Sequence, residues 1–314
     1  SILSVYKRGM IMKRIISCLV GILIMNRLAW AGPIRVITTT EDLAAIVREV
    51  GGQLVAVESL TRGSQDPHFL EARPSLILKT SKAGLFVQVG LDLEVGWAPA
   101  LLVGSRNPNI QPGASGYLDA SRDIKILEIP SVPLDRTRGD VHPFGNPHYW
   151  LDPENGKIIA RSIAQGLSAL LPDKTQEIEQ NLKGFTGRLD EAVIRWKARM
   201  KPYEGTKVIT YHRSWTYFAE RFGLVVVSYV EPKPGIPPSS AHIAQLVPLM
   251  KHEGVKLIIK EPYFSRSIPD LLSRETGARV LVLPQSVGGA EGIGTYIDLF
   301  DHLIGQVIAA LAGG

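Results

Sequence analysis

The sequence predicts an α/β protein with two similar lobes, each built on a mostly parallel sheet, joined by one long rigid α-helix. Three observations lead to this prediction. Short apolar runs alternate with longer amphipathic runs from residue 33 onward, which is typical of parallel strands covered by helices. The alternation starts again after residue 205. Between the two halves, apolar residues recur every three or four positions through residues 172–205, which is the spacing of one helical face.

The first 31 residues have the composition of a secretory signal. Lys13 and Arg14 precede an apolar run over residues 15–25, and Ala29-Trp30-Ala31 provides a small-x-small cleavage site before Gly32. A retained membrane anchor is the alternative, but the apolar run is shorter than the roughly 20 residues that a span needs. We therefore expect cleavage and export.

Charge and cysteine content exclude several classes of protein. Five of the 35 basic residues precede residue 32, so the remainder holds 30 basic and 30 acidic residues. The remainder has no excess of positive charge with which to bind nucleic acid or an anionic membrane surface. The single cysteine, Cys18, lies within the predicted signal, where it only loosely resembles a lipoprotein acylation site. Any metal held by the rest of the chain must therefore use histidine nitrogen and oxygen ligands.

The elements of the first half can be assigned in order. Apolar β-rich runs predict strands at 34–39, 54–60 and 85–90. Helical spacing of apolar residues predicts helices at 41–52, 73–83 and 153–172.

The stripe at 172–205 contains two glycines, Gly184 and Gly187. Each glycine costs about 1 kcal/mol in a helix interior, so two helices broken at this point are the alternative. The phase of the stripe does not change across them, which favours one helix.

The second half repeats the pattern with strands at 207–211, 224–230, 255–260 and 279–283, and with helices that include 239–253 and 294–311. The expected organisation is thus a signal peptide and upstream residues at 1–31, an N-terminal lobe at 32–171, a linker helix at 172–204 and a C-terminal lobe at 205–314.

Two Pro-His-aromatic motifs point to a metal site in the cleft between the lobes. They lie in "QDPHFLEARPS" (65–75) and "GNPHYWLDPENG" (145–156), and each places a histidine, His68 or His148, just before a helix. His212 ends the strand run "KVITYH", and ligands of open α/β sheets bind beyond the carboxyl ends of strands. Three imidazoles from two lobes would form a Zn²⁺-type site with one position left over.

The residues around these histidines support the same prediction. Pro67 and Pro147 restrict the backbone before each histidine. Asp66 and Asp152 could accept the second ring N–H of the histidines and fix their orientation. The alternative is that each histidine is an ordinary capping or packed residue.

The remaining histidines carry weaker signals. His242, His252 and His302 lie on predicted helices and are expected to be structural or solvated. His142 is close to His148 on the same loop, so it could serve as an auxiliary or transfer ligand.

The sequence resembles the metal-specific solute-binding proteins of bacterial zinc and manganese ABC importers. The resemblance runs through "DPHFLEARPS", "NPHYWLDPENG", "TYHRSWTYFAERFGL", "EPKPGIPPS" and "IIKEPYFS", and covers essentially the whole chain after residue 31. It implies two α/β lobes on one long helix, with metal ligands at His68, His148 and His212. Manganese-specific members commonly have glutamate where this chain has His212, so the resemblance favours zinc over manganese. It also implies a periplasmic location and delivery of the metal, by a monomer, to an inner-membrane permease with a cytoplasmic ATPase.

The chain departs from the family pattern at the fourth ligand. Many relatives supply a carboxylate near the C-terminus, where "LPQSVGG" here places Gln285. Glu261, at the end of "KLIIKE", is the nearest carboxylate and could be a fourth ligand or the partner of a histidine. Water is the remaining candidate. The His/Asp-rich loop of many zinc members is absent from the sequence, and only His142 remains in that region.

A secreted three-histidine zinc hydrolase is the alternative function, because an ion with an open position can also activate water. Such an enzyme would need a general base, for which Glu261 is the candidate, but the sequence contains no HExxH motif. Metal capture needs no further residues, so we expect a transport protein and no catalytic residues.

Overall fold

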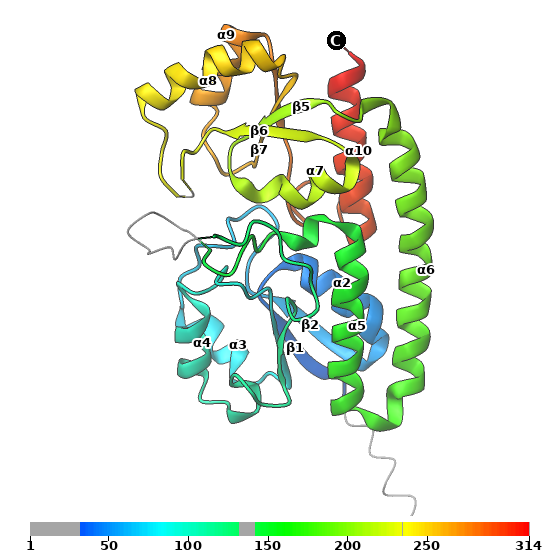
Figure 1. Ribbon diagram of the computed structural model, residues 1–314. Coiled ribbons are helices and arrows are strands. Elements are labelled where there is room, and N and C mark those ends of the chain that lie inside the picture. Colours follow the sequence, from blue (N-terminus) through cyan, green and yellow to red (C-terminus); the bar gives the residue numbers. More distant parts are fainter. Residues whose placement is uncertain (1–31, 132–141, 234, 314) are drawn as a thin grey trace, which may run out of the picture. The chain divides into compact units, whose positions relative to one another are not determined.

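Two four-stranded parallel sheets organise the chain in a computed structural model (Figure 1). The structure describes residues 32–131, 142–233 and 235–313. The first sheet has the order β2-β1-β3-β4 and the second has the order β6-β5-β7-β8, so the two lobes share one topology and the predicted fold class is confirmed. The strands are β1 (Ile34–Thr38), β2 (Val55–Ser59), β3 (Leu85–Gln88), β4 (Tyr117–Asp119), β5 (Lys207–Thr210), β6 (Val225–Tyr229), β7 (Leu257–Lys260) and β8 (Arg279–Val282).

The helices of the first lobe are α2 (Glu41–Gly51), α3 (Pro74–Thr80), α4 (Ala98–Ser105) and α5 (Pro153–Leu170). The predicted apolar faces of α2 and α5 are buried. Thr40 caps α2 by accepting the Leu43 N–H, and Asp152 caps α5 by accepting the Glu154 N–H, as is usual for these residue types. Sequence analysis missed β4 and α4, because a three-residue strand and an apolar eight-residue helix with no amphipathic face leave no periodic signal.

The long helix α6 (Thr175–Met200) is continuous through both glycines, as predicted. Short 3₁₀ helices flank it at Pro172–Lys174 and Lys201–Tyr203. Gly184 and Gly187 lie on its exposed side, whereas the apolar stripe is buried. In Figure 1, α6 runs beside α5 of the first lobe and beside α10 of the second.

The second lobe adds α7 (Thr216–Phe222), α8 (Ser240–Glu253), α9 (Ser267–Thr276) and α10 (Tyr296–Ala312). The start of α10 packs on the first lobe, where the Tyr296 hydroxyl donates to the Trp150 carbonyl. Gly156 of α5 makes this approach possible, because a Cβ there would lie 2.4 Å from the Tyr296 ring. Further along, Trp196 of α6 donates its indole N–H to Asp301 of α10 over 2.7 Å.

The two lobes share part of their interior. The largest apolar cluster contains buried side chains from both sheets' helices and from α6, while two smaller clusters lie within single lobes. A buried polar contact also links them: Asp42 of α2 accepts the Ser286 hydroxyl and, at 3.0 Å, the Val287 N–H. Residues 34–314 accordingly form one compact unit.

Within the described ranges, every helix is too short or too polar to span a bilayer. The predicted signal peptide, residues 1–31, lies outside the described residues.

Candidate metal centre

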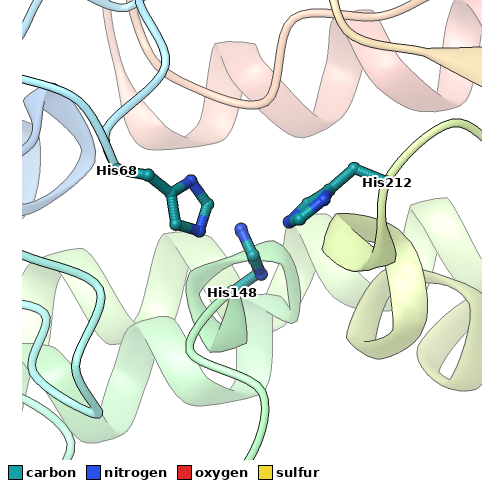
Figure 2. A group of neighbouring side chains, drawn as sticks. All are labelled: His68, His148 and His212. Atoms are coloured by element: carbon teal, nitrogen blue, oxygen red, sulfur yellow. The ribbon is translucent and has the colours of Figure 1, made fainter. Parts of the chain in front are cut away.

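The side chains of His68, His148 and His212 converge on one point (Figure 2). One ring nitrogen from each lies within 4.8 Å of the other two. The loops that carry them follow β2, follow β4 and follow β5, so two lobes contribute. His148 and His212 are 1% and 5% exposed, and the His68 side chain is 7% exposed.

The ring spacing agrees with shared coordination of one ion. The three ring centroids are separated by 5.2, 5.3 and 5.2 Å. Three imidazoles on a tetrahedral Zn²⁺, with Zn–N of about 2.0–2.1 Å and a centroid about 1.2 Å further out, would have centroids about 5.2 Å apart. Their nitrogens would be about 3.4 Å apart. The ring spacing therefore fits a shared ion without a large movement of the backbone.

One local turn positions both His68 and His148. Asp66 Oδ1 accepts the His68 backbone N–H at 3.0 Å and its ring Nδ1–H at 2.7 Å. Asn146 Oδ1 accepts the same two groups of His148, each at 2.9 Å. The two Pro-His motifs are thus two copies of one Asx-Pro-His turn, in which the residue before proline orients the ring.

The prediction for Asp66 is confirmed by this turn, and the prediction for Asp152 is wrong. Asp152 instead caps α5 and forms a two-pronged ion pair with Arg221, with both distances 2.7 Å. Sequence reasoning missed Asn146. Its signal was available, because Asn146 stands two residues before His148 just as Asp66 stands two residues before His68.

His212 is oriented from a neighbouring strand. Its Nδ1 lies 2.8 Å from Glu231 Oε2, and both side chains are buried. Glu231 follows β6, which pairs directly with β5, so the strand order brings the two residues together. Sequence reasoning missed Glu231, although it is a carboxylate just past a predicted strand.

These contacts determine which nitrogen each histidine can offer. Each Nδ1–H donates to an oxygen of Asp66, Asn146 or Glu231, which leaves the Nε2 lone pair for the centre of the group. Among the described residues, Nε2 of His148 and of His212 are buried without a hydrogen-bond partner. Buried polar atoms are normally paired, so two orphaned lone pairs that face one point fit a metal ion.

His142 lies beside the same point. Its Nε2 is 3.2 Å from Nε2 of His68, and the two ring centroids are 5.2 Å apart. Because His68 already donates from Nδ1 to Asp66, its Nε2 is the acceptor and His142 is the donor in this contact. An ion bound to His68 would have to displace His142 or bind it as well.

The surroundings move the pKa values of His148 and His212 in opposite directions. Burial, with the neighbouring imidazoles, lowers the pKa of His148 well below its ordinary value. Burial also acts to lower the pKa of His212, but the hydrogen bond to Glu231 and the charge of Glu261 outweigh it and raise that pKa. His148 is therefore neutral and ready to bind a metal, whereas a proton competes with the metal at His212.

Glu261 and Gln285 lie at the ends of the next two strands of the second sheet. Glu261 is fully buried, and its Oε1 accepts the Trp215 indole N–H at 3.1 Å. Burial raises the pKa of the Glu261 carboxyl, opposed by the nearby His212 and Ser214. In the described part of the chain, Oε2 of Glu261 and Oε1 of Gln285 are buried without a hydrogen-bond partner. The partner of the His212 ring N–H is Glu231, so the orienting role considered for Glu261 is filled there by another residue.

The other three histidines lie away from the group. His242 is half-buried on α8, where its ring contacts the Tyr229 carbonyl at 3.1 Å. His252 is exposed near the end of the same helix. His302 is half-buried on α10, and burial lowers its pKa.

Comparison with known proteins identifies the family. Residues 36–310 match the family described as "Zinc-uptake complex component A periplasmic". The chain belongs to this family. The predicted resemblance to zinc and manganese solute-binding proteins is thereby confirmed.

Several curated proteins are similar to the chain. The zinc-binding lipoprotein AdcA of Streptococcus pneumoniae (strain R6) is 25% identical over 255 residues, which are 80% of this chain and 50% of AdcA. The manganese ABC transporter substrate-binding lipoprotein PsaA of S. pneumoniae TIGR4 is 28% identical over 61% of this chain and 60% of PsaA. The high-affinity zinc uptake system protein ZnuA of Brucella abortus (strain 2308) is 32% identical over 43% of this chain and 41% of ZnuA. The chain thus spans 60% or less of the length of these relatives.

Solved structures share the fold over more of the chain. A crystal structure of ZnuA matches with a TM-score of 0.75 and 26% identity, covering 88% of this chain and 99% of that one. A ZnuA deletion mutant with zinc bound matches with a TM-score of 0.74 and 25% identity, covering 88% and 98%. A Cd-bound periplasmic metal binding protein from Candidatus Liberibacter asiaticus has the same fold, with a TM-score of 0.72 and 22% identity over 88% of this chain and 99% of that one.

Proposed function

We propose that this protein captures a divalent transition metal, most favourably Zn²⁺, and delivers it to an ABC importer. The observation that carries the proposal is the convergence of three buried imidazoles whose Nδ1–H groups are all engaged by oxygen acceptors. Such a group binds a cation through Nε2 and has no other evident use in a buried position.

The donor set favours zinc over manganese. Three neutral imidazoles with no thiolate suit Zn²⁺, while Mn²⁺ prefers a majority of oxygen ligands. The names of the relatives support zinc and leave manganese as the second candidate, because AdcA and ZnuA are named for zinc and PsaA for manganese.

The proposed ligands are Nε2 of His68, His148 and His212. For the fourth position we retain Glu261, with Gln285, His142 and water as alternatives. Glu261 is supported by its buried and unpartnered Oε2. It lies outside the set of described residues whose ligand atoms already fall within 4.8 Å of one another, so binding through it would require the carboxylate to move toward the histidines.

Family membership supports the wider assignments. We propose that the protein works in the periplasm, reached through the signal at residues 1–31, and acts as a monomer on a membrane permease with a cytoplasmic ATPase. The lobes would span residues 32–171 and 205–314, with residues 172–204 as the linker helix. The substrate-binding role named for PsaA supports the transport partners.

Metal analysis of the purified chain from Gly32 onward tests the proposal. We expect one tightly bound Zn²⁺ per molecule, retained in competition with excess Mn²⁺. Cu²⁺ should compete better than Mn²⁺, because affinity for nitrogen ligands peaks at copper. A preference for Mn²⁺, or failure to bind any of the three ions, would contradict it.

Assays of hydrolysis separate transport from the alternative of a zinc enzyme. We expect the zinc-loaded protein to show no turnover of esters, peptides or phosphate esters that depends on Glu261. Turnover lost in Glu261→Gln while Zn²⁺ stays bound would favour the enzyme, since that carboxylate is the candidate general base.

A further inference from the structure

Asn146 is buried beside the site, and both ends of its side chain make hydrogen bonds. Its Oδ1 accepts the backbone N–H and ring Nδ1–H of His148, each at 2.9 Å. Its Nδ2 donates to Glu128 Oε2 and to the Arg213 carbonyl oxygen, each at 2.8 Å. An amide carries two N–H groups and one carbonyl oxygen, so this arrangement satisfies all of them.

The direction of this amide is fixed by chemistry. The backbone N–H of His148 can only donate, and the backbone carbonyl of Arg213 can only accept. Turning the amide over would set donor against donor at one end and acceptor against acceptor at the other.

The Nδ2 contacts connect Asn146 to the second lobe, directly through Arg213 and indirectly through Glu128. Arg213 directly follows His212, the histidine that the second lobe supplies. Glu128, in the first lobe, also accepts the hydroxyls of Thr216 and Tyr229 of the second lobe, each at 3.1 Å.

A tyrosine reinforces the same junction. The Tyr217 hydroxyl, from α7, accepts the Leu127 N–H and donates to the Asn146 carbonyl, both over 2.9 Å. The backbone on both sides of the amide network is thereby held to the second lobe. Glu128 adopts a positive φ of 55°, a costly conformation for a residue with a side chain, which the surrounding contacts hold in place.

Asp66 provides the contrast. It makes the same two contacts with His68 that Asn146 makes with His148, but it does so as a carboxylate. A carboxylate at position 146 would face the Glu128 carboxylate and the Arg213 carbonyl at hydrogen-bond distance, and neither of these two acceptors carries a proton to share. The two copies of the turn are therefore not interchangeable.

We propose that Asn146 is a positioning residue that couples the orientation of His148 to the placement of the His212 segment across the lobe boundary, and that this role requires an amide. The inference rests on the proposed metal site, because its effect on binding is exerted through His148. It adds the requirement that the side chain at position 146 both accept and donate hydrogen bonds, which the metal ligands alone do not impose.

The proposal is tested by exchanging the donor and the acceptor of the hydrogen bond between positions 146 and 128. The variants are Asn146→Asp, Glu128→Gln and the double variant. Zn²⁺ affinity is measured by competition with a chromophoric chelator, and unfolding midpoints are measured on metal-free protein. Asn146→Asp should weaken binding about 10–100-fold, as changes to the partners of ligands do. The double variant should recover about tenfold, because the new amide at position 128 can donate to the new carboxylate at position 146 while its carbonyl still accepts from Thr216 and Tyr229.

Asp66→Asn is the matched control, since an amide oxygen there can still accept both N–H groups of His68. When it is combined with Glu128→Gln, the fold-losses of Zn²⁺ affinity of the two single variants should multiply. Asn146→Ser, which removes the Nδ2 donor without adding charge, covers the case in which Asn146→Asp does not fold, and it should also weaken binding.

Two results would overturn the inference. One is that the fold-losses of Zn²⁺ affinity caused by Asn146→Asp and Glu128→Gln multiply in the double variant. The other is that Asn146→Asp and Asn146→Ser both bind Zn²⁺ with wild-type affinity. If the wild-type protein bound no metal, the proposed function would fail instead. The unfolding midpoints of metal-free protein would still decide the amide bridge, by being restored in the double variant or lowered further.

Discussion

Glu231 holds His212 through a hydrogen bond of 2.8 Å between Oε2 and Nδ1, and the two residues come from adjacent strand ends of one sheet. This contact directs the Nε2 lone pair of His212 toward the other two histidines. It also places a negative charge behind the ring, which increases the ability of Nε2 to donate to a metal.

Removal of that acceptor should weaken metal binding without abolishing it. We expect Glu231→Ala to reduce Zn²⁺ affinity about 10–100-fold, because the ring loses both its fixed tautomer and the charge behind it. Glu231→Gln keeps an acceptor and should lose less. Competitive titration of both variants measures the difference, and equal losses would mean that only the charge matters.

The three central histidines should be far more sensitive to substitution than the others. We expect alanine at His68, His148 or His212 to reduce Zn²⁺ affinity by more than about 100-fold, beyond the effect of changing a ligand's partner. Alanine at His242, His252 or His302 should leave affinity unchanged, since these side chains lie on α8 and α10 away from the group. Comparable losses at His242 and His212 would contradict the assignment.

Metal affinity should fall as the pH is lowered, and His212 should dominate this dependence. A ring must be neutral to bind, and the pKa of His212 is raised while that of His148 is lowered. Below its raised pKa, His212 must release its proton on binding, so the metal displaces about one proton from this residue. Calorimetry in buffers of different ionisation enthalpy counts the protons. Glu231→Gln should reduce the release, and affinity independent of pH between 7.5 and 5 would argue against a histidine site.

The contact of Asp42 with the loop at Ser286 should make stability depend on pH. Burial raises the pKa of Asp42 from 3.8 to about 7. The folded state therefore retains a proton that the unfolded state loses near pH 4, and stability falls as the pH rises between these values. Full loss of the proton corresponds to about 4 kcal/mol.

Asp42→Asn should remove this dependence, because its amide can still accept the Val287 N–H and donate to the Ser286 hydroxyl. We expect the variant to be more stable than wild type at pH 8 and similar near pH 4. Denaturant unfolding across this range measures the difference. Glu94, whose pKa burial also raises to about 7, contributes equally to both proteins and cancels. A difference that does not change with pH would show that Asp42 is not the titrating group.

Two helical glycines should respond oppositely to alanine. Gly187 of α6 is exposed and nothing lies within 4 Å of the position of a Cβ, so Gly187→Ala should stabilise the protein by about 0.5–1 kcal/mol. Gly156 of α5 is buried against the Tyr296 ring, so Gly156→Ala should destabilise it by about 1–3 kcal/mol. Free energies of unfolding at one pH test both. Destabilisation by Gly187→Ala would mean that α6 is not regular at that point.

The sequence predicted those parts of the fold that leave a periodic signal. The strands at residues 34–39 and 207–211 and the stripe of α6 are long apolar patterns, and each lies where it was expected. The strand β4 was missed because Tyr117–Asp119 is too short for any period to appear.

The site was predictable to the extent that its residues are local in sequence. Asp66 could be paired with His68 because a turn joins them. Asp152 was also chosen because it is close in sequence, and that prediction is wrong. The residue that accepts the His148 ring N–H is Asn146, which precedes Pro147. Glu231 could not be paired with His212 across 19 residues without the strand order of the second sheet.

The shared apolar cluster has a consequence for how the molecule loses its structure. Side chains from the first lobe, from α6 and from α10 belong to one continuous interior. Opening either lobe alone would expose the apolar surface of the other and lose packing on both sides. The two sheets should therefore melt in one cooperative transition, and a fragment cut between them would lack a complete interior of its own.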